Sequence, residues 1–177
     1  MPCAAYLLSL LNRQRRLLGS AFFTRRPSSW LVWEPGSSRP APALLAERAV
    51  TNPGFVVSPR QPVGHDALCF ELERCPSVVS VGRGRDRDVA LDDLSVSREP
   101  FFLEFHEGVW IVRALDPVRV DGKQVRTAVL HDTSRLEVGE VSLTFYEPAG
   151  FPSRLERLEF EVVNRVGPQW AGLQSPR

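Results

Sequence analysis

Two polar side chains, Arg83 and Ser97, carry the clearest chemistry in the sequence. Arg83 follows an apolar run that ends at Gly82, and Ser97 lies further along in a polar stretch. An arginine offers a planar fork of N–H donors and a serine offers a hydroxyl, and both groups suit a phosphate dianion. Arg85 and Arg98 stand beside them and add positive charge. We therefore expect an anion-binding surface on two loops, held at their ends by a rigid scaffold.

Enzymatic interpretations of the same region fail on spacing. The glycines of 82–84 begin like a dinucleotide-binding loop, but Arg87 stands where the third glycine should be, and no long crossover helix follows. His106 and His131 have no serine or cysteine in a nucleophile-elbow context. The sequence therefore predicts a protein that is not an enzyme and has no catalytic residue.

The cysteines do not form a metal or disulfide pattern. His65, Cys69 and Cys75 match no structural zinc spacing, and with Cys3 the cysteines are odd in number and irregularly spaced. Free thiols among apolar residues are typical of a reducing compartment. We expect no metal site and no cofactor, and a cytoplasmic protein, with a nuclear location as an alternative.

Charge and hydropathy exclude two other classes of partner. Lys and Arg number 22 against 21 Asp and Glu, which gives a formal net charge of +1. The arginines of 83–87 are diluted by nearby carboxylates and no aromatic residue is interleaved with them, so a nucleic-acid partner is not expected. No apolar run approaches the roughly 18 residues that span a bilayer, so no membrane partner is expected and the protein should be soluble.

Short alternating segments separated by turn residues predict an all-β fold from Ala67 onward. Regular spacing without a long helical period favours a β-sandwich. A tight turn at Gly139 separates two of the predicted strands. The predicted strands are Leu68–Leu72, Val78–Val81, Asp88–Leu91, Phe101–Phe105, Val109–Arg113, Val118–Val120 and Val141–Tyr146, the last of which follows the Gly139 turn.

Several of these segments together resemble a known family. Residues 81–98 resemble the signature of the forkhead-associated (FHA) domain, in which a strand ends in Gly-Arg, Asp-Asp precedes a turn and Ser-x-x-His follows. Residues 115–123 resemble its Asn-Gly-Thr-x-Val-Asn-Gly stretch, and residues 136–140 its final hairpin. The resemblance implies an FHA-like β-sandwich of two packed sheets that binds phosphothreonine peptides. It also implies that Arg83 and Ser97 contact the phosphate.

The departures from that signature concern the ligand rather than the scaffold. Pro100 replaces the histidine of Ser-x-x-His, and Asp116 replaces the asparagine that grips the ligand backbone. A carboxylate at Asp116 would repel a bound dianion. The later turn survives as Asp121-Gly122, which suits a hairpin. We expect weaker phosphopeptide binding than a complete site gives.

The chain outside this body divides into three parts. Residues 1–29 form a basic N-terminal extension, without an acidic residue, that has the composition of a mitochondrial transit peptide or forms a short amphipathic helix. Residues 30–64 contain a possible first strand, Trp30–Trp33, and a proline-rich loop. The FHA-like domain spans 65–148, and 149–177 contains a strand or helix and a tail. Both ends are expected to be flexible.

A narrower resemblance suggests the cellular role. The altered signature and the short tails are similar to the TRAF-interacting FHA adaptors of innate immune signalling, although this N-terminus is basic and the chain has no Pro-x-Glu motif. The expected partner is a phosphothreonine-containing protein or a second copy of the chain, which would give a homo-oligomer. The alternative is a scaffold or dimerisation module that no longer binds phosphate.

Overall fold

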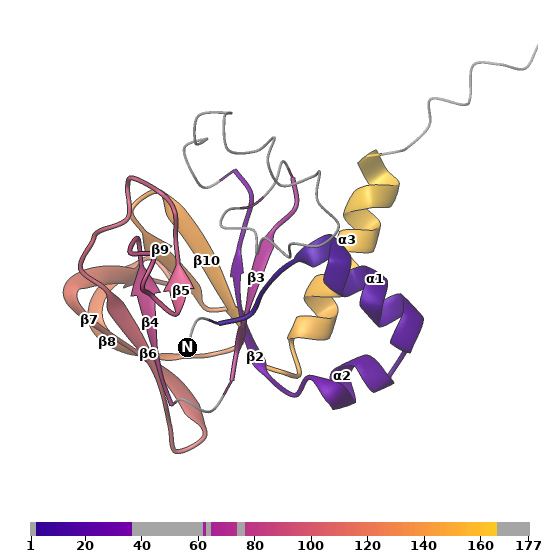
Figure 1. Ribbon diagram of the computed structural model, residues 1–177, viewed down its shortest axis with the longest axis horizontal. Coiled ribbons are helices and arrows are strands. Elements are labelled where there is room, and N and C mark those ends of the chain that lie inside the picture. Colours follow the sequence, from indigo (N-terminus) through magenta and orange to yellow (C-terminus); the bar gives the residue numbers. More distant parts are fainter. Residues whose placement is uncertain (1–2, 37–61, 63–64, 74–76, 166–177) are drawn as a thin grey trace, which may run out of the picture.

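The computed structural model describes residues 3–36, 62, 65–73 and 77–165. Strands dominate this part of the chain, and the helices lie near its two ends (Figure 1). The elements are β1 Ala5–Leu7, α1 Leu8–Leu18, α2 Ala21–Arg25, β2 Ser29–Trp33, β3 Leu68–Leu72, β4 Val78–Gly82, β5 Val89–Ala90, β6 Phe101–His106, β7 Val109–Val120, β8 Lys123–Leu130, β9 Arg135–Val138, β10 Val141–Tyr146 and α3 Phe151–Arg165.

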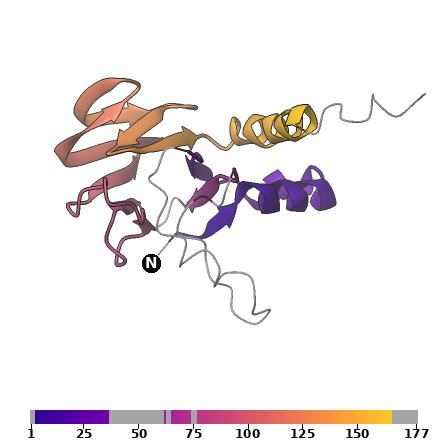
Figure 2. The ribbon, with the colours of Figure 1, turned by 90° about the horizontal axis from the view of Figure 1, so that it is seen from above.

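The described strands form one curled sheet whose two halves face each other. The order is β1-β3-β2-β10-β9-β7-β6-β4-β5, with β8 paired to β7. The long strand β7 joins the halves, because its first part pairs with β6 and its last residues pair with β9. Every pairing is antiparallel except that of β4 with β5. The predicted all-β sandwich is confirmed (Figures 1 and 2).

Strand boundaries follow the predictions closely where strands are short. Leu68–Leu72 and Val141–Tyr146 are strands with the predicted limits. The predicted strands Val109–Arg113 and Val118–Val120 are parts of β7, whose register with β8 shifts between them. Pro117 therefore lies in an irregular stretch, where a missing backbone N–H removes no ladder hydrogen bond.

The core of the sandwich is built by alternate residues of both halves. Leu31 and Leu143 from one half and Val81 and Leu103 from the other are all fully buried in one cluster. Trp110 crosses the sandwich, and its indole N–H donates to the Ser29 hydroxyl at 3.1 Å. Period-two alternation puts these side chains on the inner face.

A second hydrophobic cluster lies on the outer face of β2, β3 and β10. Trp30 and Val32 point into it, while Leu31 and Trp33 between them point into the sandwich core. Strand β2 is therefore buried on both faces. The helices α1, α2 and α3, which we call the helical layer, cover this outer face (Figure 2). A continuous apolar run is typical of a strand covered on both sides.

The N-terminal segment is not the flexible extension that the sequence predicted. Strand β1 pairs with β3, with Ala5 opposite Phe70. Leu8 and Leu11 of α1 are fully buried in the second cluster. Strands β1 and β2, which precede residue 65, therefore pack with the strands that follow it, and the α1 leucines exclude water from the outer face of β2 and β3.

The C-terminal segment is also packed where it is described. Residues 151–165 are a helix, which decides between the strand and the helix left open by the sequence. Phe151 stacks on Trp30 with ring centroids 4.5 Å apart, and Leu155 is fully buried. The predicted tail at 166–177 and most of the predicted proline-rich loop lie outside the described residues.

Ion pairs link the helical layer to the strands. Arg154 of α3 is buried and forms a two-pronged pair with Glu34, at 3.1 and 2.9 Å. Arg26 pairs with Glu71 at 2.9 Å. Charged hydrogen bonds of this kind stabilise more when they are partly buried and two-pronged. They fix the position of the layer on the sheet.

Candidate functional site

Arg83 begins the loop between β4 and β5, and two hydrogen bonds connect it to the loop between β5 and β6. Its backbone N–H donates to the Ser97 carbonyl at 3.4 Å, and its guanidinium donates through Nη1 to the Leu94 carbonyl at 3.1 Å. A guanidinium has five N–H donors, so a bond to Leu94 fixes its direction without using up the fork. We call residues 83–88 and 91–100 together the loop end.

Ser97 lies on the surface of the loop end. Its hydroxyl accepts a hydrogen bond from the Glu99 N–H at 3.1 Å. This local turn leaves the hydroxyl hydrogen available for an acceptor from outside. Pro100, at the position of the family's histidine, lies against Gly82, with its Cα 3.5 Å from where a Cβ on Gly82 would be.

A buried carboxylate braces the second loop from within. Asp93 is 4% exposed, and its Oδ1 accepts hydrogen bonds from the Ser95 N–H at 2.8 Å and the Ser95 hydroxyl at 2.6 Å. The Ser95 hydroxyl in turn accepts from the Glu140 N–H at 2.8 Å, in the turn between β9 and β10. Sequence analysis did not identify this brace, although Asp-x-Ser is the pattern of such a turn.

Gly139 allows that turn to approach the loop. Its φ is +62°, and a Cβ at this position would lie 2.3 Å from the Ser95 carbonyl oxygen. No side chain fits at such a distance, and the positive φ independently favours glycine. The glycine therefore permits the contact that holds Ser95 in place.

The first loop is braced by Asp88 and Ser80. The Asp88 carboxylate accepts from the Ser80 N–H at 3.0 Å and from its hydroxyl at 2.7 Å, while the Asp88 N–H donates to the same hydroxyl at 3.1 Å. Partial burial alone would raise the pKa of Asp88, but the Ser80 hydrogen bonds outweigh it and the pKa lies below its ordinary value. These hydrogen bonds join the two ends of the loop, at Ser80 and Asp88.

Register places Asp116 at the same end of the sheet as Arg83 and Ser97. Val81 pairs with Phe101, and Phe101 pairs with Ala114. Asp116 follows Ala114 by two residues, as Arg83 follows Val81. Its side chain is exposed. The other two predicted site residues, Arg85 and Arg98, are exposed on the loop end.

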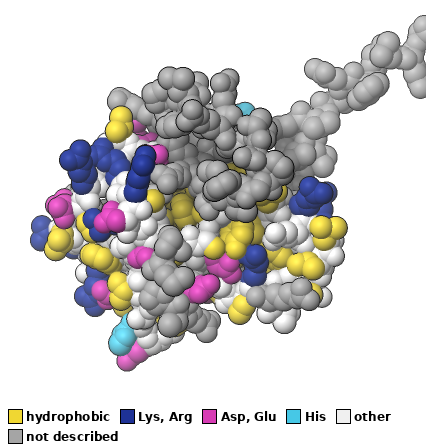
Figure 3. Space-filling view, in the orientation of Figure 1, with side chains coloured by type: hydrophobic (Ala, Val, Ile, Leu, Met, Phe, Trp, Pro, Cys, Tyr) yellow, Lys and Arg dark blue, Asp and Glu magenta, His cyan; other side chains and the backbone are white. Residues whose placement is uncertain are grey.

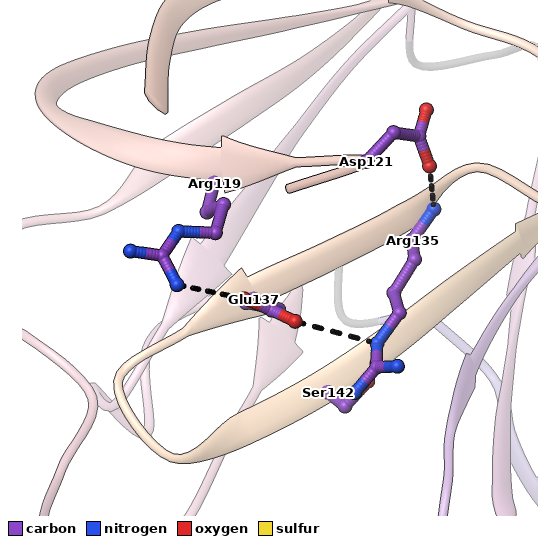
Figure 4. A network of polar contacts seen from close by, with 5 residues as sticks. All are labelled: Arg119, Asp121, Arg135, Glu137 and Ser142. Atoms are coloured by element: carbon purple, nitrogen blue, oxygen red, sulfur yellow. Dashed lines mark hydrogen bonds and ion pairs between the residues drawn. The ribbon is translucent and has the colours of Figure 1, made fainter. Parts of the chain in front are cut away.

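The Asp121-Gly122 turn has the predicted hairpin geometry. Both residues have positive φ, 49° and 79°, as a two-residue hairpin of the mirror-image type requires. The Asp121 carboxylate accepts from the Arg135 N–H at 2.8 Å (Figure 4). The hairpin of β7 and β8 is thus tied to β9.

Beside this turn, β9 and β10 carry a polar groove. It has a volume of about 500 Å³ and is lined by Glu34, Arg135, Glu137 and Ser142, among others. Glu137 pairs with Arg119 at 3.3 Å and with Arg135 at 3.5 Å, and Arg135 also donates to the Ser142 hydroxyl (Figure 4). The charges of the groove largely pair with one another.

The described residues contain no cluster of His, Cys, Asp or Glu that could hold a metal ion. Burial, with the Asp88 carboxylate nearby, raises the pKa of the Cys3 thiol to about 12, and burial raises that of Cys69 well above its ordinary value. Such thiols stay protonated and are poor metal ligands. Cys75 lies outside the described residues. None of the described helices is both long and apolar enough to span a bilayer.

The loop end lies within a segment that matches a known domain family. A sequence model of the FHA domain matches residues 79–139, about a third of the chain. No curated protein matches. Solved structures include one titled as an analysis of phosphothreonine-dependent FHA domain interactions, with 18% identity and a TM-score of 0.46 over 67% of this chain and 95% of that one. Another is the FHA domain of the CT664 protein from Chlamydia trachomatis, with 15% identity and a TM-score of 0.44 over 67% and 97%. The matched residues include both loops of the loop end.

Proposed function

We propose that this chain, which carries an FHA domain over residues 79–139, is a non-enzymatic interaction module that binds phosphothreonine peptides at the loop end. The observation that carries the proposal is the pair of hydrogen bonds from Arg83 to the loop of Ser97. They place a guanidinium and a hydroxyl on two loops that are joined to each other. Preorganised donors bind an anion without first losing conformational entropy.

The braces beneath the loops support the same function. Asp93 holds Ser95, and Asp88 holds Ser80, so each loop has its own internal support. Leu94, whose carbonyl accepts from Arg83, leaves its side chain 85% exposed on the loop end. An exposed leucine beside cationic donors suits a peptide better than a free phosphate ion.

Asp116 sets the expected strength of binding. A carboxylate and a phosphate a few ångströms apart at a wet surface repel by about 1 kcal/mol per pair of unit charges. The family's asparagine would also supply an amide donor that Asp116 lacks. We infer that Asp116→Asn strengthens phosphopeptide binding by about tenfold, which corresponds to about 1.4 kcal/mol.

The test is a titration of the full chain with a phosphothreonine peptide library and its unphosphorylated counterpart at two salt concentrations. Arg83→Ala should abolish phosphate-dependent binding, and Arg126→Ala, on the exposed edge strand β8, is the matched control that should not. In the Arg83→Ala background Asp116→Asn should gain little, and a double-mutant cycle measures that coupling. Equal affinity for phosphorylated and unphosphorylated peptides would favour the second candidate function, a scaffold that does not bind phosphate. The replacement of the family's asparagine by Asp116 and of its histidine by Pro100 supports this second candidate.

The resemblance to the TRAF-interacting FHA adaptors suggests a more specific cellular role. We infer an adaptor that assembles signalling partners in the cytoplasm, in the manner of the TRAF-interacting FHA adaptors, through a phosphothreonine-containing partner or self-association. Sedimentation of the chain with and without a bound phosphopeptide would detect phosphate-dependent assembly. A chain that stays monomeric in both conditions would contradict self-association.

A further inference from the structure

Asp116 lies in a short irregular stretch of β7 that is anchored at both ends. Ala114 pairs with β6, while Val118 is buried and pairs with β8. Residues 114–117, which we call the irregular stretch, bulge out because β7 has four residues there where β8 has one. Pro117 also restricts the backbone of Asp116 to extended conformations. The backbone that carries the exposed Asp116 carboxylate is therefore well fixed.

The spacing of the strands sets the distance between Arg83 and Asp116. Arg83 follows β4 and Asp116 lies in β7, and β6 runs between these two strands. Neighbouring strands are about 4.8 Å apart, so the two backbones are about 10 Å apart at this end of the sheet. An extended peptide covers that distance in about three residues. A peptide that crosses the strand ends with its phosphothreonine at Arg83 therefore brings a residue about three positions away to Asp116.

The Asp116 carboxylate forms no hydrogen bond or ion pair within the part of the chain that the structure describes. The two arginines of β7, Arg113 and Arg119, pair with glutamates of β6 and β9 at 2.5 and 3.3 Å. Arg126 of β8 lies across the irregular stretch, and no ion pair joins it to Asp116 in the described residues. The carboxylate is thus exposed next to the loop end with its negative charge unpaired.

Carboxylates outnumber arginines in the loop end even before Asp116 is added. It contains four arginines and five carboxylates: Arg83, Arg85, Arg87, Arg98, Asp86, Asp88, Asp92, Asp93 and Glu99. Arg87 already pairs with Asp86 at 3.7 Å. Figure 3 shows basic and acidic side chains interspersed over the upper left of the molecule, where the loops beside β5 lie (Figure 1). A phosphate bound at Arg83 adds further negative charge, so a cation elsewhere on the peptide is favoured at this surface.

We propose that Asp116 selects phosphothreonine peptides that carry a lysine or arginine about three residues from the phosphothreonine, where the cation pairs with the Asp116 carboxylate. This inference rests on the proposed binding of phosphothreonine at Arg83 and Ser97, and it names the peptides that the site prefers. Asp116→Asn then strengthens the binding of peptides that lack the cation, whereas peptides that carry it lose their ion pair. A side chain that weakens the binding of most phosphopeptides and favours a few is a means of specificity.

The probes are labelled peptides with a central phosphothreonine, otherwise uncharged residues and one lysine, alanine or glutamate placed about two to four residues to either side. Fluorescence anisotropy with the full chain measures their affinities, and unphosphorylated forms test the dependence on phosphate. At the best position the lysine peptide should bind about threefold more tightly than the alanine peptide and about tenfold more tightly than the glutamate peptide, as exposed charge pairs do. Raising the salt concentration should reduce the ratio of the lysine and glutamate affinities.

Matched variants assign the selection to Asp116. Asp116→Asn should bring the lysine and glutamate affinities to within about twofold of each other, and Asp116→Lys should reverse the preference. Glu107→Gln removes an exposed carboxylate at the opposite end of β6 and β7 and should leave the ratio unchanged. Arg126→Gln removes the cation across the irregular stretch and should not abolish the lysine preference. Each of these side chains is exposed, and far-UV circular dichroism checks that every variant folds.

Four results would overturn the proposal. Phosphate-dependent binding with equal affinities for the lysine, alanine and glutamate peptides would support the proposed function but show that Asp116 does not select. A lysine preference that survives Asp116→Asn would assign the selection to another carboxylate. A preference that appears only after Arg126→Gln would show that Arg126 neutralises Asp116 in the unaltered chain. The absence of any phosphate-dependent binding would contradict the proposed function as well.

Discussion

The two hydrophobic clusters of this protein share three strands but depend on different parts of the chain. The sandwich core takes Leu31 and Trp33 from β2 and closes against strands that follow β3 in sequence. The second cluster takes Trp30 and Val32 from the same strand and closes against helices from both ends of the described chain. Strand β2 thus belongs to both clusters, as β3 and β10 do.

The two clusters differ in the elements that they hold in place. The sandwich core holds strand ends, and the loops at those ends carry Arg83 and Ser97 on short polar braces. The second cluster holds helices by aromatic stacking, as between Trp30 and Phe151, and by the Arg154–Glu34 pair. The sandwich therefore supports a polar site, and the second cluster fixes the helical layer on the sheet. If both clusters fold together, damage to either must unfold the same cooperative unit.

Losing a tryptophan from either cluster should have the largest effect. Trp110→Ala in the sandwich core and Trp30→Ala in the second cluster should each lower the free energy of unfolding by about 3 to 5 kcal/mol. Both side chains are almost fully buried, at 2% and 1% exposure. Urea unfolding followed by far-UV circular dichroism measures the loss. A Trp30→Ala midpoint equal to that of the unaltered protein would mean that the helical layer is not part of the cooperative unit.

Truncating a leucine of α1 should have the next largest effect. Leu11→Ala should cost about 2 to 5 kcal/mol, because a fully buried leucine leaves a cavity. Leu17→Ala, on the exposed side of the same helix, is the control and should change stability by about 0.5 kcal/mol or less. Thermal melts of the two variants compare the faces directly. Equally small losses of stability in both variants would mean that the N-terminal segment is a flexible extension, as its composition suggested.

A methyl group at Gly139 should affect the loop end more than the core. Gly139→Ala should cost about 1 to 3 kcal/mol, because it combines a positive φ with a clash against Ser95. Gly108→Ala has a positive φ but nothing within 4 Å, so it isolates the backbone contribution. The Gly139 variant should also weaken phosphopeptide binding, and the Gly108 variant should not. Equal losses of stability would show that the Ser95 contact contributes little.

Removing the Asp88–Ser80 brace should cause the smallest loss of stability, and this loss should depend on pH. Ser80→Ala should cost about 1 kcal/mol at pH 7, the usual contribution of such hydrogen bonds. Asp88 has a pKa below its ordinary 3.8, so its charged form contributes stability above that value, and this is lost as the pH falls through the folded pKa. The difference between the variant and the unaltered protein should therefore shrink below about pH 4. Urea midpoints between pH 7 and pH 2.5 measure it, and a difference that grows on acidification would contradict the brace.

The strands rich in buried apolar residues were predictable from the sequence, and one strand with few buried residues was not. Val78–Gly82 and Val141–Tyr146 alternate or concentrate apolar residues, and their predicted limits agree with the structure to within one residue. Strand β8 was missed because Leu130 alone is fully buried in it, so no alternation marks it. The brace around Asp93 was missed because its partner Glu140 is 45 residues beyond Ser95.

The sequence by itself determined the sandwich, the Asp121-Gly122 turn and the two loops on which Arg83 and Ser97 lie, because alternation and turn residues are local properties of the chain. Only the tertiary structure decided that Trp30–Trp33 is a central strand buried on both faces and that the basic N-terminus is packed rather than flexible. The side chains that cover β2 come from distant segments, as the Arg154–Glu34 pair across 120 residues illustrates. An amphipathic helix such as α1 has the same local pattern whether its apolar face meets a sheet, a partner or water, and only the fold determines which.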